Sequence, residues 1–190
     1  QLAQAEAIMR KRINKKHMDN GVTIINPENT YIEANVQIGK DTIIEPGVML
    51  IGNTEIGDEC IIGMNSSITN SKIGNFTEVK ISTIIDSAVG ENTTVGPYAY
   101  LRPNSNVGNH VKIGDFVEVK NANIGDYSKA SHLSYIGDAD VGKDVNIGCG
   151  VVFVNYDGKN KFRSVVEDGA FIGSNSNLVA PVHVKHKGYI

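Results

Sequence analysis

An aliphatic residue recurs every six residues, and occasionally every five, over most of this chain. The register begins at Ile32 and runs to Ile190 with one interruption, and only Ala130 and Phe153 among its members are not Ile, Leu or Val. Six is not a helical period, because 3.6 residues per turn does not divide it evenly. A short fixed period of this kind predicts a solenoid built from repeated units.

A second position in the repeat indicates the element type. Two residues before many of the repeat positions stands a small or β-branched residue, such as Thr42, Val48 or Cys60. Side chains two apart on a strand share a face, so each hexapeptide predicts a short strand with two inward residues. Glycine often follows the repeat position, as at Gly57 and Gly114, and we expect corners there that need positive φ or close backbone packing.

Three hexapeptides make a triangular coil of about eighteen residues, so the 27 repeat positions predict nine coils. Coils pair in parallel at about 4.8 Å per step, which gives a stack about 40 Å tall. No coil buries its apolar edge alone, so stacking creates the core. The expected fold is an all-β solenoid, a parallel β-helix.

The first eighteen residues carry strong helix formers and no repeat. We expect residues 1–18 to form a helix whose apolar face holds Leu2, Ala5, Ile8, Met9 and Ile13, and residues 19–190 to form the solenoid. No capping element follows Ile190, so we expect a solenoid that is truncated at this end or covered by a partner.

Composition narrows the function classes. With 18 basic and 21 acidic residues the net charge is −3, which argues against a nucleic-acid partner. Two cysteines form no disulfide framework and favour a cytoplasmic location. The sequence contains no long apolar segment of the kind that would predict contact with a membrane.

Polar residues that the repeat does not require gather between Arg102 and Ser174. Arg102 and Lys120 are eighteen residues apart, so we expect them to lie one above the other and to repel unless an anion lies between them. Glu118 and His132 are fourteen apart, and we expect them to meet near a corner, as a site would require.

The stretch VNYDGKNKF, residues 154–162, interrupts the repeat. Lys159 stands where an aliphatic residue is due, and Asp157-Gly158 is a turn signal. We predict a loop pushed out from the prism, where backbone approaches a ligand or a neighbouring chain.

The motifs LRPNSNVG, FVEVKNANIGDYSKASHLSYIGDADVG, VNIGCG, VNYDGKNKF and FIGSNSNLVAPV closely resemble the acetyltransferase half of the bacterial bifunctional N-acetylglucosamine-1-phosphate uridylyltransferase/glucosamine-1-phosphate N-acetyltransferases. The resemblance implies a left-handed β-helix and transfer of an acetyl group from acetyl-CoA to glucosamine 1-phosphate, on the way to UDP-N-acetylglucosamine and cell-wall precursors. It also implies that residues 1–18 are a linker helix, left from the junction to a missing nucleotidyltransferase half that holds the Mg²⁺ site.

Carried over by position, the resemblance assigns His132 as the general base and Glu118 as the carboxylate that orients its imidazole. It implies substrate contacts from Arg102, Lys120, Tyr135, Asn146, Asn155 and Lys161. It implies acetyl-CoA contacts from Cys149, Asn155, Tyr156 and Ser174. It implies no metal in this half, and a homotrimer with sites between chains.

Other interpretations remain open. A zinc-dependent carbonic anhydrase uses a similar solenoid but needs three converging histidines, and only His132 lies in the motif-rich region. An acyltransferase for another acceptor, and a non-catalytic trimerisation solenoid, are the further alternatives. We expect Cys60 to pack in the core, and the four histidines outside the motifs to be solvated, namely His17, His110, His183 and His186.

Overall fold

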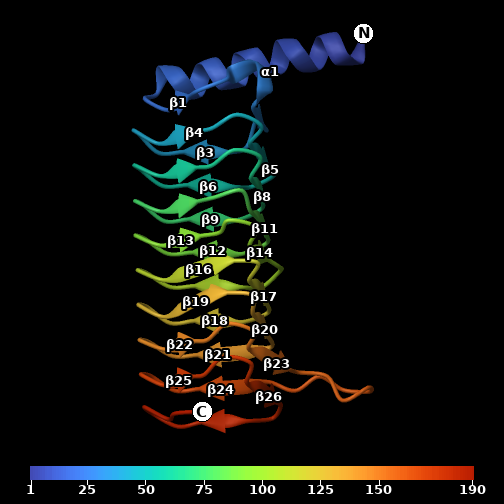
Figure 1. Ribbon diagram of the computed structural model, residues 1–190. Coiled ribbons are helices and arrows are strands. Elements are labelled where there is room, and N and C mark those ends of the chain that lie inside the picture. The colour runs from blue at the N-terminus through green and yellow to red at the C-terminus, as the bar shows by residue number, and fades with distance from the viewer.

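The computed structural model describes all 190 residues as one helix lying across the end of a triangular β-solenoid (Figure 1). Three parallel sheets of nine strands each form the sides of the prism. Every coil contributes one strand to each sheet, so nine coils were correctly predicted from the repeat. The chain winds as a left-handed β-helix, the hand that the resemblance implied.

The first sheet contains β1 (Thr23–Ile24), β4 (Ile43–Ile44), β7 (Ile61–Ile62), β10 (Glu78–Val79), β13 (Thr94–Val95), β16 (Lys112–Asp115), β19 (Lys129–His132), β22 (Asn146–Ile147) and β25 (Phe171–Ile172). The second contains β2 (Tyr31–Ile32), β5 (Met49–Ile51), β8 (Ser67–Thr69), β11 (Thr83–Ile85), β14 (Tyr100–Leu101), β17 (Glu118–Lys120), β20 (Tyr135–Gly137), β23 (Val152–Val154) and β26 (Asn177–Val179). The third contains β3 (Gln37–Ile38), β6 (Glu55–Ile56), β9 (Lys72–Ile73), β12 (Ala88–Val89), β15 (Asn106–Val107), β18 (Asn123–Ile124), β21 (Ala139–Val141), β24 (Ser164–Val166) and β27 (His183–Val184).

The two inward positions of each hexapeptide fill one continuous core of 38 buried apolar residues. Ala130 and Phe153, the exceptions in the repeat, are both buried there, and so is Cys60, as predicted. Many inward Ser and Thr side chains are hydrogen-bonded to backbone groups of neighbouring coils, whereas the buried Ser164 hydroxyl has no partner. Thr42, for example, donates its hydroxyl to the Gly57 carbonyl at 2.8 Å and accepts from the Cys60 amide at 3.0 Å. Repeat position Ile190, in contrast, is 47% exposed.

The corners between sheets define three edges of the prism. We call them the first edge (first to second sheet), the second edge (second to third) and the third edge (third sheet to the next coil). Glycine at these corners serves mainly close packing: a Cβ on Gly114 would lie 1.9 Å from the Ser131 carbonyl oxygen. Positive φ is instead carried largely by other residues, such as Asp86 (φ 44°) and Asp138 (φ 49°) on the second edge.

Side-chain oxygens stitch the third edge together. The backbone amide of Lys40 donates to Asp58 Oδ1 at 2.8 Å, and the amide of Asp58 donates to Asn75 Oδ1 at 2.9 Å. Further along, the Asn109 amide donates to Asp126 Oδ1 at 2.8 Å. In each case the acceptor belongs to the coil that follows the donor. The ladder satisfies corner amides that no strand partner reaches.

Helix α1 (Leu2–Asp19) lies within one residue of the predicted bounds, but of the predicted apolar face only Ile13 packs against the core. Leu2 is 86% exposed, whereas the polar Asn14 and His17 are buried. Asn14 Nδ2 donates to the carbonyls of Pro27 and Thr30 at 2.8 and 3.0 Å, across the short 3₁₀ helix η1 (Pro27–Asn29). The helix therefore covers the first coil through the side-chain amide of Asn14. These hydrogen bonds to backbone carbonyls of the coil determine which face of the helix turns inward.

Burial also overturns the expectation that His17 is solvated, and it lowers the pKa of that imidazole below its usual value. His110, His183 and His186 are exposed as expected, with the His110 ring stacked on Tyr127 at 4.7 Å between centroids.

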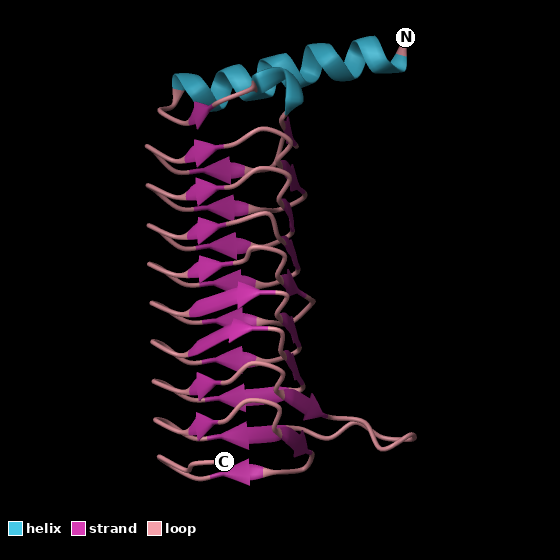
Figure 2. Cartoon of the chain, viewed as in Figure 1, coloured by secondary structure: helices cyan, strands magenta, loops and turns pink.

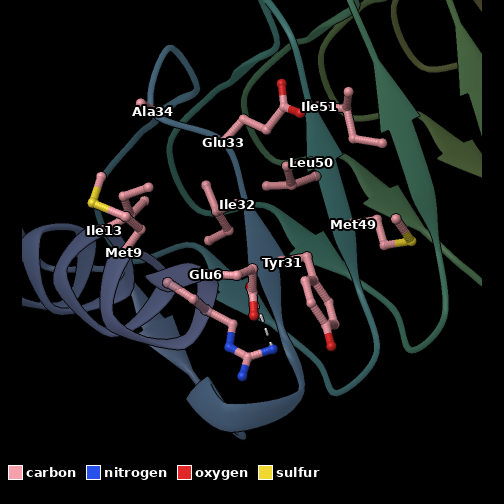
Figure 3. Close-up of a pocket in the computed structure, with 11 residues that line it drawn as sticks. Glu6, Met9, Ile13, Tyr31, Ile32, Glu33, Ala34, Met49, Leu50 and Ile51 are labelled. Atoms are coloured by element: carbon pink, nitrogen blue, oxygen red, sulfur yellow. Dashed lines mark ion pairs between the residues drawn. The ribbon is translucent and has the colours of Figure 1, made fainter. Parts of the chain in front are cut away.

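A cavity of about 340 Å³ lies between α1 and the first strands of the second sheet (Figure 3). Met9 and Ile13 of the helix and Met49 of β5 supply apolar walls. Arg10 lies over the Tyr31 ring at 4.7 Å and pairs with Glu6 at 3.6 Å. The chain contains no helix with the length and apolarity needed to cross a membrane.

Candidate active site

Charged side chains stack on the second edge, at the ends of β14 and β17. Arg102 follows Leu101, which pairs with Val119, and Lys120 lies directly above Gly137. The predicted stacking of Arg102 over Lys120 is therefore confirmed. The expected repulsion is offset within the chain, because each cation has its own carboxylate: Arg102 pairs with Glu118 at 2.8 Å and Lys120 with Asp138 at 3.3 Å.

Asp138 connects three side chains of this edge, and it was not among the predicted site residues. It is 7% exposed, and its carboxylate accepts hydrogen bonds from Lys120, from Asn121 Nδ2 at 2.6 Å and from Asn155 Nδ2. Burial alone would raise the pKa of Asp138, but the three donors outweigh burial and hold that pKa below its usual value.

The interruption at residues 154–162 forms the predicted loop, which extends away from the stack after β23 (Figure 2). Tyr156 and Lys161 face each other in an antiparallel bridge. At the tip, the Asp157 carboxylate accepts from the amides of Lys159 and Asn160 at 2.7 and 2.6 Å. The loop is therefore a short, turn-stabilised excursion, as Asp157-Gly158 indicated.

Each end of this loop is tied to the prism. At its start, Asn155 is buried, and its Nδ2 reaches Tyr135 Oη at 3.3 Å as well as Asp138. At its end, Arg163 donates to both carboxylate oxygens of Asp140 at 2.6 Å and to the carbonyl of Asn121 at 2.8 Å. The exposed Tyr156 and Lys161 lie between the two anchors.

Lys161 returns from the loop to the second edge. Its ammonium lies near that of Lys120, and this neighbouring positive charge lowers the pKa of Lys161. Lys120 is partly buried, which by itself lowers its pKa, but contacts with Lys161 and Asp138 raise the pKa overall. Three cationic groups therefore converge on one edge, and Lys161 has no carboxylate partner.

His132 lies on the first edge, at the end of β19. Its Nδ1 is 2.8 Å from Asp115 Oδ1, because β16 and β19 place the two residues directly opposite each other. The predicted contact between Glu118 and His132 was therefore wrong within a single chain. Glu118 lies past the corner on the second sheet, opposite Tyr135, and bonds Arg102 instead.

Two further predicted residues continue the first edge below His132. Cys149 and Ser174 follow Ile147 and Ile172 by two residues, as His132 follows Ala130, and these three strand residues pair in register. The Asn175 amide also donates to the Cys149 carbonyl at 2.8 Å. Asn146 lies apart from both edges, on the outward face of the first sheet between Lys129 and Phe171.

The structure thus brings most of the predicted residues into two groups, each of which also contains an aspartate that was not predicted. The first-edge group contains Asp115, His132, Cys149 and Ser174. The second-edge group contains Arg102, Glu118, Lys120, Tyr135, Asp138, Asn155 and Lys161. The second sheet, which carries Glu118 and Tyr135 side by side, connects them. No group of three metal-ligating side chains converges in the chain, so a single chain does not offer the set that the zinc alternative requires.

Sequence reasoning missed Asp115, Asn121, Asp138 and Arg163. The first three follow from one spacing, since the coils in this region are 17 residues long. Asp115 is 17 residues before His132, and Asp138 is 17 after Asn121 and 17 before Asn155. A search for polar partners at that spacing would have found them. No comparable signal marks Arg163, whose contacts span the loop.

The model of the bacterial transferase hexapeptide (six repeats) matches residues 35–70 and 86–121. The chain is 76% identical over all 190 residues to the bifunctional protein GlmU of Clostridioides difficile (strain 630) and 60% identical to that of Alkaliphilus metalliredigens (strain QYMF). It spans 41% and 42% of the length of these relatives.

Solved structures share the fold at low identity. The UDP-N-acetylglucosamine acyltransferase from Campylobacter jejuni has a TM-score of 0.53 at 15% identity, over 82% of this chain and 66% of that one. The acetyltransferase domain of PglB from Neisseria gonorrhoeae FA1090 has a TM-score of 0.50 at 15% identity, over 60% of this chain and 58% of that one.

Proposed function

We propose that this chain, which matches the bacterial transferase hexapeptide over residues 35–70 and 86–121 and is 76% identical over its whole length to part of a bifunctional GlmU protein, transfers an acetyl group from acetyl-CoA to the amino group of glucosamine 1-phosphate. The observation that carries the proposal is the division of the site into a base on one edge and a cationic cluster on the next. A phosphorylated amine needs both.

The first edge supplies the proton acceptor. An amine attacks a thioester through its lone pair, so a base with a pKa near the working pH assists as the proton leaves. Nδ1 of His132 is hydrogen-bonded to Asp115, and the His132 side chain is 55% exposed. Nε2 is therefore accessible to the amine of the sugar that accepts the acetyl group. The carboxylate favours the tautomer with hydrogen on Nδ1, and in that tautomer Nε2 carries the free lone pair.

The second edge supplies the phosphate contacts. Arg102, Lys120 and Lys161 present cationic donors there, and two of the three are already fixed by carboxylates. A phosphate monoester held by these donors is anchored at one end, which fixes the amine at the other. Tyr135 and Asn155, joined at 3.3 Å, lie close enough to contact the sugar between the ends. Asn146, out on the first sheet, contacts this substrate only if a neighbouring chain brings that face to it.

The thioester fits the column beneath His132. Cys149 and Ser174 lie one and two coils further along the same edge, where acetyl-CoA brings its carbonyl carbon to the amine. The developing oxyanion needs a donor, and a backbone amide near Asn155 or Tyr156 is suited to that task. The bond that forms joins the amine nitrogen to the acetyl carbon, and His132 takes the proton from that nitrogen. The thioester C–S bond breaks, and coenzyme A leaves as its thiolate with the electron pair of that bond.

The active form in this proposal is a homotrimer with sites between chains. Tyr98, Phe116 and Leu133 are all more than half exposed along the first edge, and the rings of Tyr98 and Phe116 stack at 5.4 Å. Apolar side chains in such a row are typical of a subunit contact. Within a trimer, Glu118 of one chain has a route to the imidazole of another, and its catalytic role stays part of the proposal.

The context of the reaction is proposed on the same ground. Helix α1 joins this domain to a nucleotidyltransferase half that uses Mg²⁺, and the two activities together supply UDP-N-acetylglucosamine for cell-wall precursors in the cytoplasm. The two free cysteines are consistent with a reducing compartment.

The test is acetyl transfer from acetyl-CoA by the full chain, with glucosamine 1-phosphate compared with glucosamine. We expect the phosphorylated acceptor to have at least a hundredfold higher kcat/KM, since charge-assisted bonds to phosphate are lost without it. Equal use of both acceptors would favour the other-acceptor alternative. A chain that forms trimers but transfers no acetyl group would favour the trimerisation solenoid.

A further inference from the structure

We infer that Asp138 is a positioning residue of the acceptor site, which holds Lys120 and Asn155 in place and so fixes the base of the loop against the second edge. The inference rests on the proposed function, because the residues it positions are proposed substrate contacts. Asp138 itself touches no substrate in this scheme.

The contacts of Asp138 connect side chains from three successive coils. Its carboxylate accepts from Lys120 and Asn121 in the coil before it and from Asn155 in the coil after it. Asn155 in turn donates to Tyr135 Oη at 3.3 Å. One carboxylate therefore sets the direction of an ammonium group and of an amide that both face the acceptor.

The corner itself does not require such a carboxylate. Asp86 occupies the same left-handed corner position on the second edge, with φ 44° against 49° for Asp138. Its side chain is exposed and makes no hydrogen bond, and its coil is as regular as any other. Burying a carboxylate is costly unless hydrogen bonds compensate it, so its burial at residue 138 calls for a role that residue 86 lacks.

The negative charge of Asp138 also contributes to its proposed positioning role. Glu118 offsets Arg102 and Asp138 offsets Lys120, which leaves Lys161 as the one cation of the cluster without a carboxylate. Without the charge of Asp138, Lys120 and Lys161 would repel each other with no anion nearby and would move apart. The acceptor phosphate would then meet cations that are no longer preorganised, and binding would pay the cost of ordering them.

The decisive variant is Asp138→Asn, which keeps the shape of the side chain, and Asp86→Asn is its matched control. Binding of glucosamine 1-phosphate by calorimetry and steady-state kinetics would be measured for each full-length chain. For Asp138→Asn we expect at least tenfold weaker binding and a KM for glucosamine 1-phosphate raised to a similar degree, with the KM for acetyl-CoA within threefold of the original. Amide exchange in residues 155–162 should also become faster, whereas Asp86→Asn should alter none of these.

The possible outcomes separate the two proposals. If the unaltered chain neither binds nor acetylates glucosamine 1-phosphate, the proposed function fails. If the unaltered chain does bind it, and Asp138→Asn lowers only the melting temperature while binding and loop exchange stay unchanged, Asp138 is merely structural and the inference is overturned. An Asp138→Asn chain that fails to fold is replaced by Asn121→Ala, which removes the 2.6 Å hydrogen bond to the Asp138 carboxylate without touching a proposed substrate contact and should weaken binding in the same direction. Unchanged binding in this variant would also overturn the inference.

Discussion

The coils before Arg102 and those from Arg102 to Arg163 use the same inward residues but different corners. Ile84 and Ile136 fill the same core position of the second sheet, and both are fully buried. At the corners that follow them, Asp86 is exposed and unbonded whereas Asp138 is buried with three donors. In this solenoid the inward residues of every coil contribute to stability, whereas the side chains of a few corners form the candidate site.

The largest expected effect comes from removing the base. His132→Ala should lower kcat for acetyl transfer by about 10²–10⁴-fold, the usual contribution of general acid–base catalysis. His110→Ala is the control, because His110 is also an exposed corner histidine but stacks on Tyr127 at the third edge. Both variants should melt within a few degrees of the original in a thermal scan. Equal activity of the two variants would remove His132 from the mechanism.

Core truncation should not distinguish the two regions. Ile84→Ala and Ile136→Ala each leave a cavity in the same sheet, and each should cost about 2–5 kcal/mol of unfolding free energy. Denaturant titration of both variants measures the difference directly. A much smaller loss at Ile136 would contradict the view that the site coils share the scaffold on equal terms.

Cutting the far anchor of the loop should have a smaller, local effect. Arg163→Met removes the paired bonds to Asp140 and the bond to the Asn121 carbonyl, which together hold a half-exposed side chain. Exposed ion pairs contribute roughly 0.2–1 kcal/mol, so global unfolding should change little. Proteolysis between Tyr156 and Lys161 should be several-fold faster. Lys185→Met, which removes a 3.5 Å ion pair to Glu167 away from the loop, should leave that cleavage rate unchanged.

The smallest effect is expected from mild acid, and it should fall on the site coils. Asp138 and Asp140 have pKa values lowered in the folded chain, Asp140 chiefly by its bonds to Arg163. A lowered carboxyl pKa adds stability that is complete above the unfolded value of 3.8 and is lost as the pH falls through the folded pKa. As the pH is lowered from 5 to 3, loss of amide-exchange protection should therefore begin in the coils formed by residues 118–163 before it begins in those formed by residues 43–101. Simultaneous loss of protection throughout the stack would count against this.

Much of the fold was predictable because the strands of a solenoid place inward residues at a fixed spacing, which appears in the sequence as the repeat. Each Ile, Leu or Val marks an inward position, and strand pairing converts the count of positions into a count of coils. The handedness of the solenoid could not be predicted from the period, because left-handed and right-handed coils would show the same alternation of inward and outward residues. The inward face of α1 was misjudged for a similar reason: Asn14 is buried by the carbonyls of Pro27 and Thr30, which no helical periodicity reveals.

The site was predictable as a set of residues but not as a set of contacts. The loop was evident from the break at Lys159, and the stacking of Arg102 over Lys120 from their spacing. The partner of His132 was misassigned because a spacing of fourteen places Glu118 past a corner, whereas one coil of 17 places Asp115 opposite the imidazole. Partners in a solenoid are fixed by coil length, and a change of one residue alters them.

The ladder on the third edge gives the stack a direction. The Lys40 amide depends on Asp58, and the Asn109 amide depends on Asp126, so one amide in each of these corners is completed by the coil that comes later in the chain. During synthesis the earlier coil emerges first. That one amide of its third-edge corner must remain bonded to water until the next coil has been made. A pause in translation between two coils would therefore leave the third-edge amide of the last completed coil without its protein acceptor.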